Sequence, residues 1–549
     1  MRRWLLRLAA AAGSGALLFL ACADFDIWPL GWVGFLPLLL VLRAPDLTPR
    51  RAFLWGWLCG FTANAGGFYW ITILLMRFGH MHWLPALLLF LLLAAYQGLH
   101  WGLFGYIVKR VQLRQPQLPM TLVVPVTMTA MELIMPFIFP WYLAITQAWV
   151  IPVIQVAELA GPLGVTFLMM LANGMLYDVV GTWLERRQGE ARPWPVRPLA
   201  VGGAVLALAL VFGFVRIAQI DARRAAAPKV KIGIVQANIG IVEKGRAALA
   251  AKHLEIHREV SRELEQKGAE LLVWPESSYP YAFERDMTTD WPESHPYRVM
   301  RGLHVPLIFG AITFKRGEKY PWNSALMMEP DGRITGRFDK NYLLIFGEYI
   351  PFYKHIPSFK KWFPEASNFN RGDEVSVFSF RDWKIGPLIC YEDIIPSFGR
   401  RLAPLEPDLL VNVTNDAWFG KTSEPWEHLA LAVYRSVELR LDLVRAVNTG
   451  VSGFIDANGR LGRHTKSYDP VVDPGVPPVG LLGEAAMLRG ANTVYVALGD
   501  WLGYLCLLGV LALFFWPRRP GTEPPPRKGP ERARTTKTKT KKKKGKKRR

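Results

Sequence analysis

Long apolar runs fill the first 216 residues of this 549-residue chain and return once near its end. A helix needs about 20 apolar residues to cross the roughly 30 Å hydrocarbon core of a bilayer. Eight runs approach or exceed that length, and they lie at 5–23, 27–42, 53–76, 82–108, 119–138, 162–184, 199–216 and 493–516. The pattern predicts a polytopic α-helical membrane protein with about eight transmembrane helices. Seven of them form an N-terminal membrane domain, 1–216, and the eighth is 493–516.

Basic residues are unequally shared between the loops that join these runs. One set of alternate loops carries only Arg77, whereas the other set and its span ends carry thirteen Lys and Arg: Arg2, Arg3, Arg7, Arg43, Arg50, Arg51, Lys109, Arg110, Arg114, Arg186, Arg187, Arg192 and Arg197. Lys and Arg concentrate in cytoplasmic loops. We therefore expect both termini in the cytoplasm and residues 217–492 on the outer side of the membrane.

The strongly basic composition comes mainly from the C-terminal tail. Residues 518–549 hold 16 Lys and Arg against two Glu, a net charge of +14 out of +21 for the whole chain. We expect a disordered cytoplasmic tail next to anionic lipid, where each basic residue contributes about 1 kcal/mol. No other feature of the sequence supports a nucleic-acid partner, and we expect none.

Residues 225–490 have a different pattern, in which short strands alternate with helices. Strands are expected at 229–236, 271–274, 307–311, 324–329, 385–390, 409–414 and 453–456, and helices at 243–268 and 427–446. This alternation predicts one layered α/β domain outside the membrane. Functional groups in such folds gather just past the ends of strands.

Cys390 is the only one of four cysteines outside the apolar runs. Without a neighbouring cysteine it can be a reactive thiol or a buried small side chain. Glu276 and Lys340 are also expected at strand ends. A base can take the proton of a thiol, and a cation can stabilise the oxyanion that forms when the thiolate attacks a carbonyl. A single residue of any of these types is more often structural, so the hypothesis of a catalytic thiol depends on the occurrence of all three together.

Three motifs resemble, in order and spacing, the nitrilase (carbon-nitrogen hydrolase) superfamily: WPESS with Glu276, FDKNYLLIFGEYIPF with Lys340, and ICYED with Cys390. The membrane layout around them resembles the apolipoprotein N-acyltransferase family. Further similarity to that family lies at 412–420 (NVTNDAWFG), 425–428 (PWEH) and 445–450 (RAVNTG). The resemblance implies an inserted αββα sandwich domain in the periplasm, attached to the bacterial inner membrane.

The resemblance also implies a reaction. Cys390 attacks the ester carbonyl of a phospholipid, Glu276 acts as general base, and Lys340 stabilises the oxyanion together with the backbone N–H of Tyr391. The acyl chain then passes to the amino group of the diacylglyceryl cysteine of an apolipoprotein, which completes lipoprotein maturation. The family implies phosphatidylethanolamine as donor. We expect a monomer with no cofactor and no metal, because the ten His show no paired spacing near Cys or acidic residues.

Four further residues are candidates for the site, and two of them, Glu348 and Glu392, match acidic positions of the family's pocket. Glu348 and Glu392 orient Lys340 or the incoming amine, or they are salt-bridged residues of the wall. Asn323 and Trp418 are substrate-binding candidates. We interpret Asn323 as an amide that satisfies the hydrogen bonds of a turn, and Trp418 as an aromatic residue of a lid over the site. The chain departs from the family at Tyr342 and Ile345, where a His and a Pro are usual, and at 239–244, where a Trp is usual.

Trp141, Tyr142 and Trp149 have two interpretations. They are interfacial belt residues, which we favour, or they line the path of the acyl chain.

Two other functions remain open at the level of sequence. A membrane-tethered nitrilase-type amidase would resolve its thioester with water, and a transporter or lipid-binding scaffold would need charges along a path through the membrane, of which the spans contain few.

Residues 342–363 are too apolar for an ordinary loop, and we expect them to form a lid that dips into lipid. Replacing Leu344 and Ile345 by Asp should reduce formation of an acyl-enzyme on Cys390, because charged side chains do not insert into a bilayer. The measurement is the amount of acyl adduct formed from phospholipid bilayers. Unchanged turnover on bilayer substrate would remove the lid hypothesis.

Overall fold

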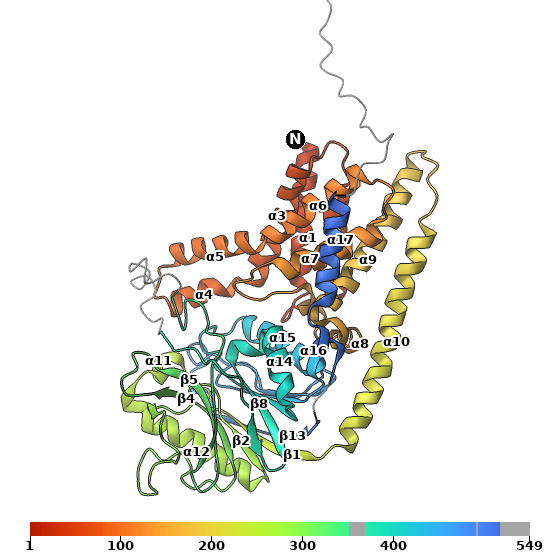
Figure 1. The fold of residues 1–549 in the computed structure, drawn as a ribbon. Coiled ribbons are helices and arrows are strands. Elements are labelled where there is room, and N and C mark those ends of the chain that lie inside the picture. Colours follow the sequence, from red (N-terminus) through yellow and green to blue (C-terminus); the bar gives the residue numbers. More distant parts are fainter. Residues whose placement is uncertain (351–367, 490–491, 516–549) are drawn as a thin grey trace, which may run out of the picture.

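The computed structural model describes residues 1–350, 368–489 and 492–515, and it consists of a helical part stacked on an α/β part (Figure 1). The helices of the main bundle are α1 (Arg2–Leu20), α3 (Pro49–Gly67), α6 (Leu99–Arg114), α7 (Met120–Ile134), α9 (Ala157–Arg187) and α17 (Trp501–Phe515). The long helix α10 (Val196–Ala226) stands beside this bundle and leads down to strand β1 (Lys229–Gln236). The chain thus returns to the helical part only after the α/β domain is complete.

Small residues let the helices of the bundle approach closely. A Cβ atom added at Gly56 of α3 would lie 2.2 Å from the carbonyl oxygen of Trp101 in α6. One added at Gly105 would lie 2.6 Å from the carbonyl oxygen of Ala52. Helices in lipid associate through such close packing, since lipid tails are as apolar as the helix surface.

All eight expected apolar runs are helical over part of their length, but several are short or broken. By length and composition, four helical stretches can cross a membrane: α1, 83–114, α9 and α10. The run at 53–76 is not one straight span, because α3 and α4 (Trp70–Arg77) meet at a bend of 55° and count as a fifth only together. The shorter apolar stretches are Trp28–Leu42, which holds η1 (Trp28–Trp32) and α2 (Leu36–Leu42), together with α7 and α17.

The bend sends one pair of helices sideways. In Figure 1, α4 and α5 (Trp83–Gln97) lean out from the bundle above the α/β domain. Trp70, the first residue of α4, is 3% exposed, and its ring packs edge-on against Phe419 of the α/β domain at 5.2 Å. The break in the apolar run therefore lies against the domain that carries Cys390.

The α/β part contains two sheets packed face to face. The first has the order β13-β1-β2-β4-β5-β6, with β3 beside β4, and the second has the order β12-β11-β10-β9-β8-β7. The first contains β1, β2 (Leu271–Val273), β3 (Phe283–Glu284), β4 (Leu307–Phe314), β5 (Trp322–Met328), β6 (Ile334–Asp339) and β13 (Val479–Ala486). The second contains β7 (Phe378–Phe380), β8 (Trp383–Ile389), β9 (Leu409–Thr414), β10 (Leu443–Val447), β11 (Gly453–Ile455) and β12 (Leu461–His464).

Helices cover the outer faces of both sheets, which gives the expected αββα layers. Helix α12 (Ala250–Gln266) covers the first sheet, while α14 (Pro396–Leu402) and α15 (Glu424–Leu439) lie between the second sheet and the helical part (Figure 1). In β1, Ile232 and Ile234 point into the core between the sheets, and Val235 packs with Leu264 of α12. Both faces of this strand are buried, which is typical of strands inside a layered α/β domain.

Three expectations for the secondary structure are wrong. The helix expected at 427–446 ends at Leu439, because Arg440 adopts a left-handed φ of 54° and the chain then forms β10. The helix expected at 243–268 is divided into α11 (Ile241–Lys244), η3 (Ala247–Leu249) and α12. Strand β13, which pairs antiparallel with β1, was not expected. The alternation of apolar and polar side chains along β13 is interrupted by Gly480 and Gly483, because glycine has no side chain on either face of the strand.

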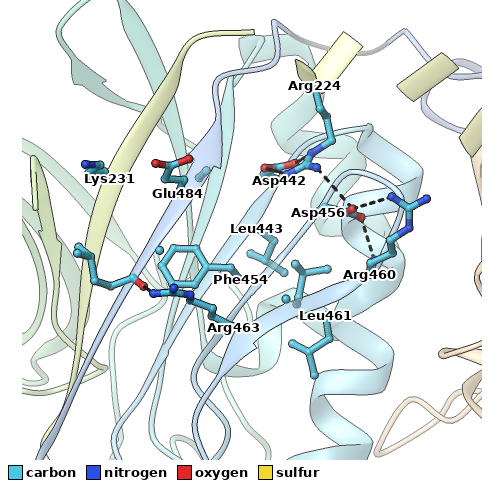
Figure 2. Close-up of a pocket in the computed structure, with 15 residues that line it drawn as sticks. Arg224, Lys231, Asp442, Leu443, Phe454, Asp456, Arg460, Leu461, Arg463 and Glu484 are labelled. Carbon is cyan, nitrogen blue, oxygen red and sulfur yellow. Dashed lines mark hydrogen bonds and ion pairs between the residues drawn. The ribbon is translucent and has the colours of Figure 1, made fainter. Parts of the chain in front are cut away.

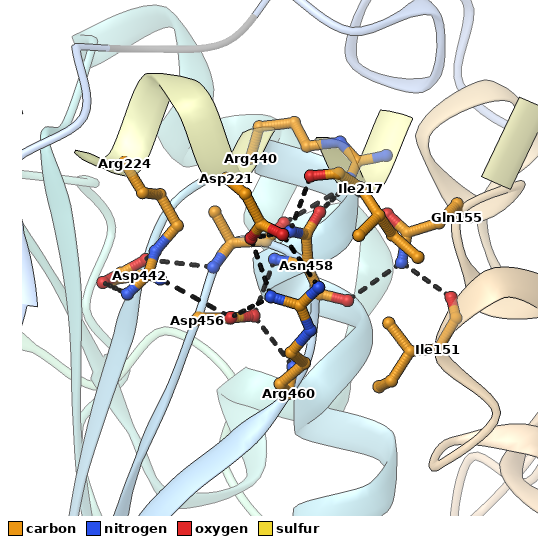
Figure 3. A network of polar contacts seen from close by, with 11 residues as sticks. Ile151, Gln155, Ile217, Asp221, Arg224, Arg440, Asp442, Asp456, Asn458 and Arg460 are labelled. Carbon is orange, nitrogen blue, oxygen red and sulfur yellow. Dashed lines mark hydrogen bonds and ion pairs between the residues drawn. The ribbon is translucent and has the colours of Figure 1, made fainter. Parts of the chain in front are cut away.

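Ion pairs and hydrogen bonds join the helical part to the α/β domain, and Figure 3 shows those between Arg224 and Asp442. Glu158 of α9 accepts hydrogen bonds from Arg216 of α10 and from Arg440, whose side chain is fully buried. Farther along α10, Arg224 makes two 2.8 Å hydrogen bonds to Asp442, which lies just before β10. Helix α10 is thereby fixed along the flank of the domain.

Replacing Glu158 by Gln should destabilise the protein by about 3–5 kcal/mol, because the buried Arg440 guanidinium would lose its counter-charge. The measurement is the thermal unfolding midpoint in detergent. Glu263→Gln is a matched control, since Glu263 forms a 3.8 Å pair with Lys267 at side-chain exposures of 66% and 60%. Exposed pairs contribute less than about 1 kcal/mol. Equal midpoints for the two variants would contradict this role of Glu158.

Candidate functional site

Cys390 lies at a sharp turn, directly after β8 and at the start of the 3-10 helix η4 (Cys390–Ile394). Its φ is +51°, in the left-handed region, which is costly for a residue with a side chain and persists only where the surroundings enforce it. The carbonyl oxygen of Cys390 accepts a 3.2 Å hydrogen bond from Asn412 Nδ2 of the neighbouring strand β9. The turn lifts the thiol out of the sheet.

Glu276 and Lys340 lie just past the ends of β2 and β6, as expected, and they are in contact. Lys340 Nζ is 3.2 Å from Glu276 Oε1 and 2.8 Å from Glu348 Oε2. The side chain of Lys340 is only 2% exposed, so its ammonium group depends on these two carboxylates for charge compensation. The structure thus brings Glu276, Lys340 and Glu348 together, and the ion pair of Glu348 fits both of its interpretations, as a residue that orients Lys340 and as a salt-bridged residue of the wall.

Asn323 is part of the same cluster. Its amide nitrogen donates to Glu276 Oε1 at 2.7 Å and to Glu348 Oε1 at 2.8 Å. The sequence-based interpretation of Asn323 as an amide that satisfies a turn is wrong, because this residue lies within strand β5. Its two N–H groups instead hold two carboxylates in place.

Glu392 is fully buried and has backbone partners. Its carboxylate accepts from the N–H groups of Ile389 at 2.8 Å, Asn341 at 2.6 Å and Tyr342 at 3.1 Å. Burial raises the pKa of Glu392 to about 8, although these donors and Lys340 act in the opposite direction. Glu392 therefore ties the turn at Cys390 to the segment after Lys340, which neither interpretation from the sequence anticipated.

Tyr391 and Trp418 connect the site to the helical part. The hydroxyl of Tyr391 donates to the carbonyl oxygen of Ile138 at 3.1 Å. The ring of Trp418 packs edge-on against Phe78, just past the end of α4, with ring centroids 4.8 Å apart. Trp418 is therefore a contact between the domain and α4.

The charges of the cluster act on the thiol of Cys390. Burial raises the pKa of this thiol well above its ordinary value, and the carboxylate of Glu276 raises it further, while Lys340 lowers it. Burial alone lowers the pKa of Lys340, but Glu276 and Glu348 outweigh that effect and hold the pKa above its usual range. At neutral pH the thiol is protonated and Lys340 is charged, so a base must remove the thiol proton during reaction.

An apolar cavity opens beside Cys390, and both parts of the protein line it. The helical part contributes Phe68, Trp70, Phe139, Pro140, Trp141 and Ile145, and the domain contributes Leu344, Tyr391, Ile394, Phe419, Glu424, Glu427, His428 and Leu431. Trp141 is 1% exposed and packs against Trp101. The favoured interpretation of an interfacial belt is therefore wrong for Trp141, which lines the cavity next to the thiol.

A buried cluster of charged residues lies beneath Cys390, and the sequence did not reveal it. Asp416, Glu424 and His428 bring possible ligand atoms within 4.8 Å of one another, so His428 does have acidic neighbours, contrary to expectation. The spacing of Glu424 and His428 by four residues on a helix was the available signal. Arg445 contacts Asp416 at 3.4 Å and supplies a cation there.

A larger cavity lies elsewhere in the described part of the chain (Figure 2). It measures about 730 Å³ and is lined by the edges of both sheets, including Leu443, Phe454 and Leu482. Its charged residues are largely paired already, since Arg224 contacts Asp442 and Asp456. None of the three site residues Glu276, Lys340 and Cys390 lines it.

Comparison with known proteins identifies both parts of the chain. Residues 14–175 match the apolipoprotein N-acyltransferase N-terminal domain, and residues 231–470 match the carbon-nitrogen hydrolase family. An apolipoprotein N-acyltransferase of Geobacter metallireducens is 33% identical over 514 residues, which cover 91% of this chain and 94% of that protein. This chain belongs to the apolipoprotein N-acyltransferase family. Another relative of the same name, from Bdellovibrio bacteriovorus, is 31% identical and covers 81% of this chain and 83% of that protein.

Two similar solved structures match part of this chain. An amidase from Nesterenkonia sp. has 18% sequence identity and a TM-score of 0.34, covering 47% of this chain and 91% of that one. A nitrilase-superfamily protein of Saccharomyces cerevisiae has 15% identity and a TM-score of 0.34. Membership in the acyltransferase family and the nitrilase-like domain, both expected from the motifs, are confirmed by the family models and the curated relatives.

The raised pKa of Cys390 predicts slow modification by a small reagent at neutral pH. The rate of alkylation by iodoacetamide should rise about tenfold per pH unit between pH 6 and 9, because the thiolate fraction does so below the pKa of a thiol. The measurement is the mass of the peptide that contains Cys390 after timed alkylation. A rate that levels off below pH 8 would show that the thiol is not held protonated.

Proposed function

We propose that this enzyme transfers an acyl chain from a membrane phospholipid to the amino group of the N-terminal S-diacylglyceryl cysteine of an apolipoprotein, the last step of bacterial lipoprotein maturation. The single observation that supports this most strongly is the position of Cys390. Its thiol lies between the charged cluster of Glu276 and Lys340 and an apolar cavity that is lined in part by the helical part. A nucleophile in this position can meet an ester whose acyl chain comes from the membrane.

In the first half-reaction Glu276 takes the proton of the Cys390 thiol, and the thiolate attacks the ester carbonyl of the phospholipid. Lys340, with the backbone N–H of Tyr391, stabilises the oxyanion of the tetrahedral intermediate. The intermediate collapses, the glycerol oxygen leaves with the proton held by Glu276, and a thioester remains on Cys390. Asn323 holds the carboxylate of Glu276 in position by a hydrogen bond, and Glu348 holds the ammonium group of Lys340 by an ion pair.

In the second half-reaction the amino group of the acceptor cysteine attacks the thioester carbonyl. Lys340 again stabilises the oxyanion, and Glu276 transfers the proton lost by the amine to the departing sulfur. The products are an amide and a free thiol, so the cycle is ping-pong. Glu276 therefore serves as base and acid in turn.

The proposed arrangement in the cell follows the distribution of basic residues. Eight spans cross the bacterial inner membrane, both termini are cytoplasmic, and the catalytic domain (225–490) is periplasmic, which places the cavity at the level of the outer leaflet. The donor is phosphatidylethanolamine and the enzyme acts as a monomer. The basic tail (518–549) and most of the proposed lid (342–363) lie outside the described residues.

The cavity favours acyl transfer over hydrolysis of small amides. Its lining is mainly apolar apart from Glu424, Glu427 and His428, and it includes aromatic side chains from the helical part such as Phe68 and Trp141. The cavity measures about 40 Å³ in this structure, so it must widen to take an acyl chain, and each methylene group buried there contributes about 0.8 kcal/mol. A soluble amide gains no such contribution.

Mass spectrometry of the purified protein tests the proposal. Incubation with phosphatidylethanolamine in detergent should add the mass of one acyl chain to the Cys390 peptide, and a diacylglyceryl-cysteine peptide should then remove it and gain the same mass. Absence of the adduct, or its loss without acylation of the peptide, contradicts the proposal. Loss to water alone would favour the amidase.

Variants of the cluster should slow formation of this adduct by different amounts. Glu276→Gln should lower the rate by about 10²–10⁴-fold through loss of the base, and Lys340→Met by about 10²–10³-fold through loss of oxyanion stabilisation. Single-turnover kinetics measure both effects. Lys315→Met, which changes an exposed lysine just after β4, is the control and should acylate at the normal rate. If Lys340→Met acylates Cys390 as fast as the unmodified protein does, Lys340 does not stabilise the oxyanion.

A further inference from the structure

Arg445 lies beneath the turn that carries Cys390, in strand β10 of the second sheet. Its guanidinium group is fully buried. Nη1 contacts the carboxylate of Asp393 and lies 3.3 Å from Asn412 Oδ1, and Nη2 lies 3.4 Å from Asp416 Oδ2. One side chain thus reaches three polar groups in the layer behind the nucleophile.

Two of these groups hold opposite ends of the Cys390 turn. Asp393 belongs to the same 3-10 helix as Cys390, three residues later. Asn412 donates through its amide nitrogen to the carbonyl oxygen of Cys390 at 3.2 Å. Arg445 therefore fixes the first residue of the turn through Asn412 and the fourth through Asp393.

His428 completes the contacts of Asp393 from helix α15. Its Nε2 lies 2.8 Å from Asp393 Oδ1, and its Nδ1 lies 3.4 Å from Asp416 Oδ1 and 3.7 Å from Glu424 Oε1. Burial and Arg445 lower the pKa of His428, but Asp393 and Asp416 outweigh them and raise it to about 10. A protonated imidazole donates from both nitrogens, so each oxygen of Asp393 has a fixed cationic partner.

We propose that Arg445 is a positioning residue, which holds the left-handed conformation of Cys390 through Asp393 and Asn412 and so aims the thiol at the substrate carbonyl. His428 supports it by holding Asp393 from the other side. The inference rests on the proposed acyl transfer for one of its measurements. A backbone conformation that costs roughly 1–3 kcal/mol needs such support to persist.

Stability alone does not require this arrangement. Buried ion pairs are often replaced by apolar residues of similar volume without loss of stability. An apolar side chain, however, cannot direct hydrogen bonds to both ends of one turn. Lysine retains the charge of arginine but lacks its planar fork of donors. Replacing Arg445 by Lys and by Met therefore separates the effect of the charge from the effect of the hydrogen-bond geometry.

The test uses the full-length protein in detergent and three variants: Arg445→Lys, Arg445→Met, and Asp393→Asn combined with Arg445→Met. In Arg445→Lys, acylation of Cys390 by phosphatidylethanolamine should slow by about 100-fold, the scale of a misplacement of about 1 Å. Alkylation of Cys390 by iodoacetamide at pH 7 should become faster, because burial is the main cause of the raised pKa of the thiol and a relaxed turn exposes it.

The double variant separates positioning from stability. Removing both charges of the pair should bring the melting temperature back toward that of the unmodified protein, while acylation stays slow. Arg435→Met is the matched control, since Arg435 and Glu438 form an equally buried pair within α15, away from the turn. It should lower the melting temperature but leave acylation per folded molecule unchanged.

Two results would overturn the proposal: recovery of acylation in the double variant, or a parallel decrease of alkylation and acylation in Arg445→Lys. Failure of the proposed function is distinguishable from both. In that case the unmodified protein forms no acyl adduct, while the alkylation rates of Cys390 in the variants still report whether Arg445 holds the turn.

Discussion

The site depends on one buried cation. Lys340 can stay charged at 2% exposure only because Glu276 and Glu348 lie within 3.2 Å of its ammonium group. The same cluster acts on Cys390, because burial raises the pKa of the thiol and the carboxylate of Glu276 raises it further. Asn323 then fixes the distance between the two carboxylates. Charge compensation in a dry environment thus determines where all four side chains lie, and the strand ends of the first sheet serve to present them.

The second sheet has the complementary task of presenting the thiol. Cys390 follows β8, its carbonyl group is held from β9, and Asp393 in its turn is held from β10 and α15. Each supporting residue comes from a different element, so the geometry of the turn depends on the second sheet together with the helix α15 that covers it. Ion pairs through Glu158 and Asp442 in turn fix the sandwich to α9 and α10.

The sequence predicted those features that depend on local patterns. Apolar runs located the helices, and the motifs around Glu276, Lys340 and Cys390 located the ends of the strands that carry them. It failed where long-range contacts decide. The residues of β10 continue a helical pattern, and only pairing with β9 makes them a strand. Asn323 has no distinctive local pattern, and the motif that contains Arg445 does not show what Arg445 contacts, because the partners of both residues lie 25 or more residues away along the chain.

The bend between α3 and α4 has a consequence for how the enzyme is built. A break in a helix at membrane depth leaves peptide groups that lipid cannot satisfy, so protein must cover it. Here Phe68 and Trp70 at the break lie against the catalytic domain and form one wall of the cavity beside Cys390. An excised α/β domain would keep Glu276, Lys340 and Cys390 but would lose that wall. The bent helix pair and the α/β domain therefore build one surface together, and a change of shape in either of them alters the cavity beside Cys390.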